Sequence, residues 1–278
     1  LHGRVDRFDK LFGAVVDREP AGVFVGGDIL PHALAANPSG DPLLDDFVGG
    51  YLANRLRDVR KKMGERYPEL FVILGNDDGK TEEDKCKRLA EEGLWRYAHG
   101  RRFSFGMLEV FGYSYVPPTP FLNKDWERYD VSRYIPPGSV SPEDGSRSDG
   151  LPGHIIRHST IKRDLDNLAG DSKLDNAIML FHTPPHETML DRVGLDGQMI
   201  ENVPLDLHVG SIAVRRFIES RSPLVTLHGH IHESARITGS WRDRIDRTHV
   251  FTAAHDGPEL ALVSFDTDNL ENATRELL

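Results

Sequence analysis

Cysteine is almost absent from this chain, and long apolar runs are missing altogether. The 278 residues include 1 cysteine, Cys86, so no disulfide can form within the chain. Because a lone free thiol is typical of a reducing compartment, the sequence favours the cytoplasm. No apolar run approaches the roughly 18 residues that a membrane-spanning helix needs, so we do not expect a membrane as partner.

Positive charge is also scarce. Lys and Arg number 34 against 44 Asp and Glu, which gives a formal net charge of −10. A protein that binds a nucleic-acid polymer neutralises its phosphates with a basic surface, so we do not expect such a polymer as the main partner. Internal repeats and low-complexity linkers are missing as well. We therefore interpret residues 1–278 as one domain, whose oligomeric state the sequence leaves open.

The sequence does contain a repeated order of apolar run, polar cluster and helix. Four short apolar runs are typical of buried strands, and each leads directly into Asp, Asn or His. These runs cover 21–27, 70–74, 177–181 and 224–227. Helical periodicity is found at 8–16, 44–63, 160–168 and 210–219, an antiparallel pair is predicted at 101–114, and closing strands at 249–254 and 260–265. The order predicts an α/β fold whose polar clusters meet at the carboxyl ends of largely parallel strands.

Two segments differ from this regular order. Residues 81–92 are strongly charged, so we expect an exposed helix that includes Cys86. Residues 115–158 carry many Pro, Gly, Ser and Asp with little periodicity, which is typical of a functional loop or a partly disordered segment. Its aromatic residues, including Trp126 and Tyr129, form either a lid that stacks on a flat substrate group or an excursion packed by its own side chains.

The polar clusters at the strand ends have the composition of a metal site. They comprise Asp28, Asn76-Asp77-Asp78, His182, and His230 with His232, and a further candidate, His2, stands near the start. Imidazoles with carboxylate or amide oxygens, and no thiolate, suit Mn, Fe or Zn. Alternating histidines at the end of one strand point to the same side. Each residue alone has an ordinary explanation as a turn former or a satisfied histidine, but the four strand ends together favour a metal site.

Gly27-Asp28, Gly75-Asn76, His182 and Gly229-His230-Ile231-His232, in this order, resemble the motifs of the calcineurin-like metallophosphoesterases. The resemblance runs from His2 to about Phe265. It implies central mixed β-sheets that form a β-sandwich flanked by helices, in four layers α/β/β/α, and two divalent cations, Mn, Fe or Zn. The family opens with Asp-x-His at the end of its first strand. Because Leu1-His2-Gly3-Arg4 is similar to the tail of that motif, the resemblance also implies an N-terminal strand and an Asp one position before Leu1.

The resemblance assigns a role to each matching residue. His2 and His232, with the implied Asp, would hold the first metal, and Asp28 would bridge both metals. Asn76, His182 and His230 would hold the second. A hydroxide between the metals would attack phosphorus in line, so Asp28, Asn76 and His230 are the implied catalytic residues.

Asp77 departs from the family pattern, which commonly has a histidine there that contacts phosphate or protonates the leaving group. Members without that histidine resemble diesterases more than monoesterases, so we expect a small phosphodiester or nucleotide as substrate. Asp77 stays a candidate catalytic residue, although two neighbouring cations would lower its pKa and make it a poor acid. We expect Asp78 to fix the loop or orient a ligand, and His228 to be structural or to support a ligand.

Arg4 and His186 are candidate substrate-binding residues. Arg4 follows His2 closely enough to meet a phosphate oxygen, although a surface salt bridge is an equally natural role for it. His186 follows a Pro-Pro pair after His182 and lies within reach of a substrate in this interpretation.

Other functions stay open at this point. A phosphomonoesterase or protein phosphatase is a close variant, and a non-catalytic protein-binding scaffold on the same fold is an alternative of a different class. The aspartate at position 77 favours the scaffold, whereas the retention of the other ligands favours an enzyme. A metallo-β-lactamase-like site is rejected, because Ile231-His232 follows His230 where that motif requires Asp-His.

Overall fold

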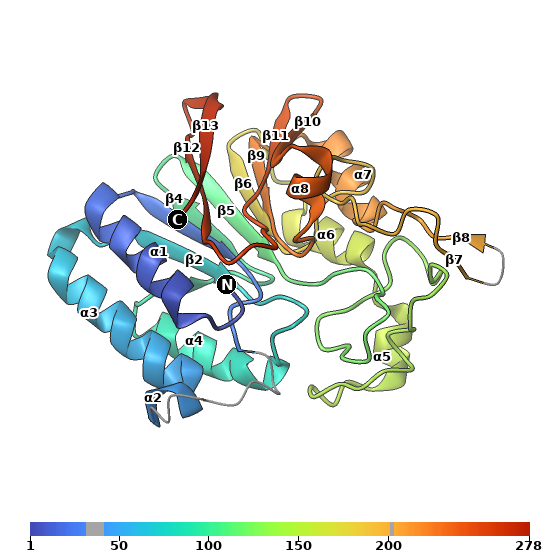
Figure 1. Cartoon of the computed structure of the whole chain (residues 1–278), viewed down its shortest axis with the longest axis horizontal. Helices are drawn as coiled ribbons and strands as arrows, with labels where there is room; N and C mark the ends of the chain where they lie inside the picture. The colour runs from blue at the N-terminus through green and yellow to red at the C-terminus, as the bar shows by residue number, and fades with distance from the viewer. Residues whose placement is uncertain (32–41, 201–202) are drawn as a thin grey trace.

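Two β-sheets and two hairpins carry the fold in the computed structural model, which describes residues 1–31, 42–200 and 203–278 (Figure 1). The smaller sheet is parallel and consists of β1 (Gly22–Gly26), β2 (Glu69–Ile73) and β3 (Arg96–Tyr97). The larger sheet has the order β10 (Arg242–Ile245), β11 (Thr248–Thr252), β9 (Val225–His228), β6 (Ala177–Phe181), β5 (Leu108–Tyr113) and β4 (Arg102–Phe105). Its four central strands are parallel, and β4 and β10 pair antiparallel at its edges.

The remaining strands form the hairpins, and the helices lie outside the sheets (Figure 1). The hairpins are β12 (Ala261–Asp266) with β13 (Asn269–Leu277), and β7 (Met199–Ile200) with β8 (Val203–Pro204). The α-helices are α1 (Val5–Arg18), α2 (Pro42–Asp45), α3 (Ala53–Met63), α4 (Glu83–Glu91), α5 (Gly153–His158), α6 (Ile161–Ala169), α7 (Ile212–Arg221) and α8 (Ser234–Thr238). A π-helical segment, Phe47–Leu52, precedes α3, and 3-10 turns occupy Gly64–Arg66 and Lys80–Glu82. The architecture is therefore a mixed α/β fold with several sheets and flanking helices, and the sheets of the described residues do not close into a barrel.

The central strands are apolar on both faces because both faces are buried. In β2, Phe71 and Ile73 belong to a core cluster that also contains side chains of β5, β6, β9 and β11. Val72 points to the other face and packs in a second cluster with residues of α1, α3 and α4. Because side chains on both faces of the strand are buried, consecutive residues are apolar, which explains the continuous apolar runs in the sequence. The order of elements indicated largely parallel strands, and the structure divides these strands between two sheets.

The segment 115–158 is an ordered excursion that packs against itself. Trp126 and Tyr129 are 0% and 2% exposed, so neither can stack on a substrate as the lid interpretation required. Lys124 and Glu127 form an ion pair of 2.6 Å that is itself buried. The sequence analysis did not predict this small core, because the segment is polar and rich in proline and its buried residues follow no regular period.

The expected exposure of Cys86 is wrong. The thiol lies on the inner face of α4 and is fully buried, and burial raises its pKa. The charged residues of α4 are confined to the other faces of the helix, which the composition of 81–92 did not reveal. Across the described ranges, no helix has the length and apolarity needed to cross a bilayer.

Candidate metal centre

The predicted ligands meet at one edge of the two sheets. Asp28 follows β1, Asn76 follows β2, His182 follows β6 directly, and His230 and His232 follow β9. Since these strands are parallel to their neighbours, their carboxyl ends bring side chains that are distant in sequence to one place. His2 joins them from the segment before α1, where its backbone N–H donates to the carbonyl oxygen of Asp28.

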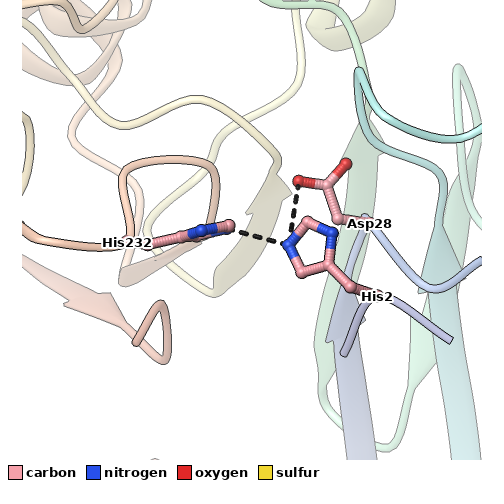
Figure 2. A group of neighbouring side chains, drawn as sticks. All are labelled: His2, Asp28 and His232. Carbon is pink, nitrogen blue, oxygen red and sulfur yellow. Dashed lines mark hydrogen bonds and ion pairs between the residues drawn. The ribbon is translucent and has the colours of Figure 1, made fainter. Parts of the chain in front are cut away.

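His2, Asp28 and His232 form the first group of ligand atoms (Figure 2). The Nε2 atoms of His2 and His232 face each other at 3.0 Å. Nε2 of His2 also lies 3.8 Å from Oδ2 of Asp28. Two imidazole nitrogens this close to a carboxylate need a shared proton or a cation between them, so the donor set fits a divalent metal ion.

Asp28, His182 and His230 form the second group, with Asn76 beside it. Nε2 of His182 lies 3.3 Å from Oδ2 of Asp28 and 2.9 Å from Oδ1 of Asn76. The Nδ1–H of His182 donates to the carbonyl oxygen of Gly26 at 2.6 Å, which turns Nε2 toward the group. Asp28 belongs to both groups, as the family resemblance implied for this residue.

Strained backbone accompanies three of these ligands. His2, Asp28 and His230 have φ values of 49°, 50° and 69°, in the left-handed region that residues other than glycine rarely adopt. Such conformations cost about 1–3 kcal/mol each and cluster at functional sites. The strained backbone is an independent indication that this sheet edge is a functional site.

Two glycines allow the ligands to approach one another. A Cβ atom on Gly75 would lie 2.3 Å from Oδ1 of Asp28 and 2.5 Å from Cε1 of His182. One on Gly27, where φ is 98°, would lie 2.6 Å from Nδ1 of His182. Both positions therefore require glycine for steric reasons.

The carboxylate and the imidazoles of the centre shift one another's pKa values. Burial opposes the charge on Asp28, but the imidazoles of His182, His2 and His230 outweigh it and hold the pKa of Asp28 well below its usual range. Burial works against protonation of His182, yet Asp28 outweighs it and raises the pKa of His182. Burial and the nearby His182 lower the pKa of His230 to about 3, so this ring is neutral at pH 7 and can donate a lone pair to a metal.

Asp78 holds the two loops that carry Asp28 and Asn76. Its buried carboxylate accepts backbone hydrogen bonds from Leu30 at 2.8 Å, Ile29 at 3.2 Å and Gly75 at 2.8 Å. Burial and repulsion from Asp28 raise the pKa of Asp78 to about 7. The expectation that Asp78 fixes loop geometry is thus confirmed.

His228 has a structural role. Its Nδ1–H donates to the carbonyl oxygen of Thr183 at 2.8 Å, and its Nε2 lies 2.8 Å from the hydroxyl of Thr226. With both ring nitrogens engaged, His228 has no lone pair for a metal. The backbone turns sharply after this residue, so His230 and His232 enter the centre while His228 stays in the core.

Arg4 and His186 lie away from the ligand atoms. Arg4 forms a two-pronged ion pair with Asp6 at the surface, with contacts of 2.9 and 3.2 Å. His186 lies 3.3 Å from Asp206, and its ring is near His208. The structure therefore does not join either side chain to the ligand cluster through a described contact.

A cavity of about 810 Å³ opens onto the centre and is lined by five of the ligands: His2, Asp28, His182, His230 and His232. Its remaining walls are mainly apolar and include the edge of β1 and the strand β12. Among the described strands, β1 pairs only with β2, so its other edge faces this cavity.

Sequence reasoning missed the groups that support the ligands. The carbonyl oxygen of Gly26 orients His182, and the side chain of Asn123 donates to the carbonyl oxygen of Asn76 at 3.3 Å. A backbone carbonyl carries no signal in a sequence. Asn123 lies in the irregular excursion, far from any recognisable motif.

Comparison with known proteins gives a fold but no function. No family model matches the chain. An uncharacterized protein of Methanocaldococcus jannaschii, MJ1162, is 38% identical over 79 residues, which are 28% of this chain and 30% of that protein. The crystal structure of TT1561 from Thermus thermophilus has a TM-score of 0.55 at 15% identity and covers 99% of this chain and 94% of its own. Another crystal structure reaches a TM-score of 0.59 at 18% identity with the same coverage. These structural similarities extend over the whole chain and concern the fold alone.

Proposed function

We propose that this protein is a metal-dependent phosphoesterase, with a centre for two divalent cations that share Asp28. The observation that carries the proposal is the position of this buried carboxylate, which belongs to both groups of ligand atoms. A shared carboxylate between two sets of imidazoles is the arrangement that a pair of cations about 3.5–4 Å apart requires. The strained backbone of Asp28 and the glycines beside it support a purpose of this kind.

The chain's own residues divide the work of such a centre. His2 and His232 would hold one cation, and Asn76, His182 and His230 the other. When bound, divalent cations lower the pKa of water and neutralise charge on a phosphoryl group. Asp28, Asn76 and His230 would lie next to the reacting atoms.

The packing of the two sheets supports a finer assignment of the fold. A core cluster contains side chains of β2 together with side chains of β5, β6, β9 and β11. Helices α1, α3 and α4 pack on the other side of the smaller sheet (Figure 1). We infer a four-layer α/β/β/α sandwich of the calcineurin-like metallophosphoesterase type.

We further propose that the substrate is a phosphodiester or a nucleotide. Asp77, which stands at the position of the family's histidine, lies beside the first group, with Oδ2 3.5 Å from Nδ1 of His2. A monoester leaving group needs a proton donor more than an activated diester does, and a carboxylate next to cations supplies a proton poorly. Mn is the first metal to test, with Fe and Zn as alternatives.

The test combines metal uptake with hydrolysis. Protein stripped with a chelator and dialysed against Mn²⁺ should retain about two equivalents by elemental analysis, as expected for a two-metal site. It should then hydrolyse bis-nitrophenyl phosphate faster than the mono-ester. A preference for the mono-ester would contradict the diesterase assignment alone.

Absence of Mn, Fe and Zn uptake would contradict the enzyme itself. In that case the non-catalytic scaffold on the same fold becomes the better explanation. The ordered excursion at 115–158 would then offer a binding surface, since Phe121 and Leu122 are exposed on it.

A further inference from the structure

Asp77 touches both halves of the centre from the outside. Its Oδ1 accepts a hydrogen bond from Nδ2 of Asn76 at 3.0 Å. Its Oδ2 lies 3.5 Å from Nδ1 of His2, within ion-pair distance. One carboxylate therefore contacts a candidate ligand from each of the two groups.

Each contact involves the side of the ligand that faces away from the centre. Nε2 of His2 points to His232 and Asp28, and Nδ1 points to Asp77. A neutral imidazole that offers the lone pair of Nε2 carries its proton on Nδ1, and an acceptor at Nδ1 favours this tautomer. The same geometry occurs at His182, whose Nδ1–H donates to a backbone carbonyl oxygen.

The contact with Asn76 fixes the orientation of an amide. Because Nδ2 of Asn76 donates to Asp77, its Oδ1 is turned the other way and lies 2.9 Å from Nε2 of His182. An amide rotated by half a turn would present a donor to the centre, and an N–H group cannot ligate a cation. Asp77 therefore selects the face of Asn76 that a metal needs.

We propose that Asp77 is a positioning residue that orients His2 and Asn76 together, and so couples the two halves of the centre. This inference rests on the proposed metal centre and goes beyond it. It differs from the role of general acid, because Asp77 would act through the two ligands that it contacts.

The experiment measures Mn²⁺ binding by calorimetry in the full chain after chelator treatment. Asp77→Ala should weaken both equivalents by about 10–100-fold, the usual effect of removing the group that orients a metal ligand. Asp77→Asn keeps an acceptor oxygen for one of the two contacts, so its loss should be smaller. Glu82→Gln is the matched control, since the side chain of Glu82 is also 28% exposed but pairs with Lys85.

A second readout does not depend on the metal. Nitrogen-15 spectra of the histidine rings, with His2 assigned through a His2→Gln variant, should show the Nδ1–H tautomer of His2 in the parent and its loss in Asp77→Ala. Mn²⁺ affinities within twofold of the parent in Asp77→Ala would overturn the positioning role while leaving the metal centre intact. Should the parent take up no Mn²⁺, the proposed function fails, and an unchanged His2 tautomer in Asp77→Ala would overturn the positioning role as well.

Discussion

The two halves of the candidate centre share Asp28 but differ in their surroundings. The half that we call buried consists of the buried side chains of Asn76 and His182 with the half-buried His230. The open half consists of His2 and His232, with Asp77 behind them. In the buried half, His182 is 1% exposed and is oriented by a carbonyl oxygen at 2.6 Å. In the open half, the side chain of His2 is 18% exposed and its outer nitrogen lies 3.5 Å from Asp77.

This difference indicates that the two cations would be held unequally. Fixed donors in a low-dielectric surrounding interact more strongly with a charge than donors that water can reach. We therefore expect the buried half to bind its cation more tightly and the open half to exchange its cation more readily. The same protein fold would then provide one structural and one adaptable position within a single centre.

The largest effect is expected when the charge of Asp28, which both halves share, is removed. Asp28→Asn keeps the shape of the side chain but removes the charge, so we expect turnover to fall by at least about 10²–10³-fold. Both metal equivalents should weaken in calorimetry. Retained turnover in this variant would contradict the assignment of Asp28 to both cations.

A methyl group placed between the halves should have a similar effect for steric reasons. In Gly75→Ala the new Cβ would lie 2.3 Å from Oδ1 of Asp28, so the ligands must move apart. Overpacking of this kind costs about 1–3 kcal/mol of stability, and metal retention after dialysis should fall in both halves. Gly79→Ala, where the nearest atom would be 3.4 Å away, is the control in the same loop. Equal metal contents in the two variants would show that the close approach at Gly75 is dispensable.

Substitution of a single ligand should change the metal affinity of one half only. His182→Ala should abolish the tighter Mn²⁺ equivalent, with a loss larger than the roughly 10–100-fold that follows removal of an orienting group. His232→Ala should weaken only the looser equivalent. Titration calorimetry of both variants and of the parent measures which half binds Mn²⁺ more tightly. The comparison is wrong if His232→Ala loses the tighter equivalent.

The smallest expected effect concerns His228, which lies beside the centre without entering it. Burial lowers the pKa of His228 to about 4, from an ordinary value near 6.5. Between pH 6.5 and pH 4, His228 is protonated in the unfolded chain but neutral in the native protein. Acidification from pH 7 to pH 5 should therefore lower the free energy of unfolding by about 2 kcal/mol through this residue. Urea unfolding of metal-free protein at both pH values, compared with His228→Gln, tests this. Parallel losses in the two proteins would assign the acid sensitivity to other groups.

The strand ends were predictable from the sequence because two local signals coincide there. At 70–78, an apolar run is followed by Gly-Asn-Asp-Asp, and the structure places Asn76 and Asp78 where a parallel sheet edge requires them. These features depend on neighbours in the chain, which a sequence displays. His230 and His232 also reach the centre, but β9 ends at His228 and the backbone at His230 is left-handed, so the predicted alternation along one strand does not explain their direction.

Features that depend on tertiary packing were not accessible in the same way. The burial of Cys86 and Trp126 follows from the surfaces that α4 and the excursion happen to cover. The division of the strands into two sheets, and the strand β13, also escaped the periodicity analysis. The contact between Asp77 and His2 joins residues that are distant in sequence, so composition and spacing could not reveal it.

The left-handed backbone at His2, Asp28 and His230 has a consequence for the thermodynamics of metal uptake. Backbone hydrogen bonds hold the loop at Asp28, because the Asp78 carboxylate accepts from the N–H groups of Ile29 and Gly75. A cation that enters therefore meets donors that have already lost their conformational entropy. We expect its binding to show a small entropic penalty and little change in heat capacity, as in the occupation of a preformed host.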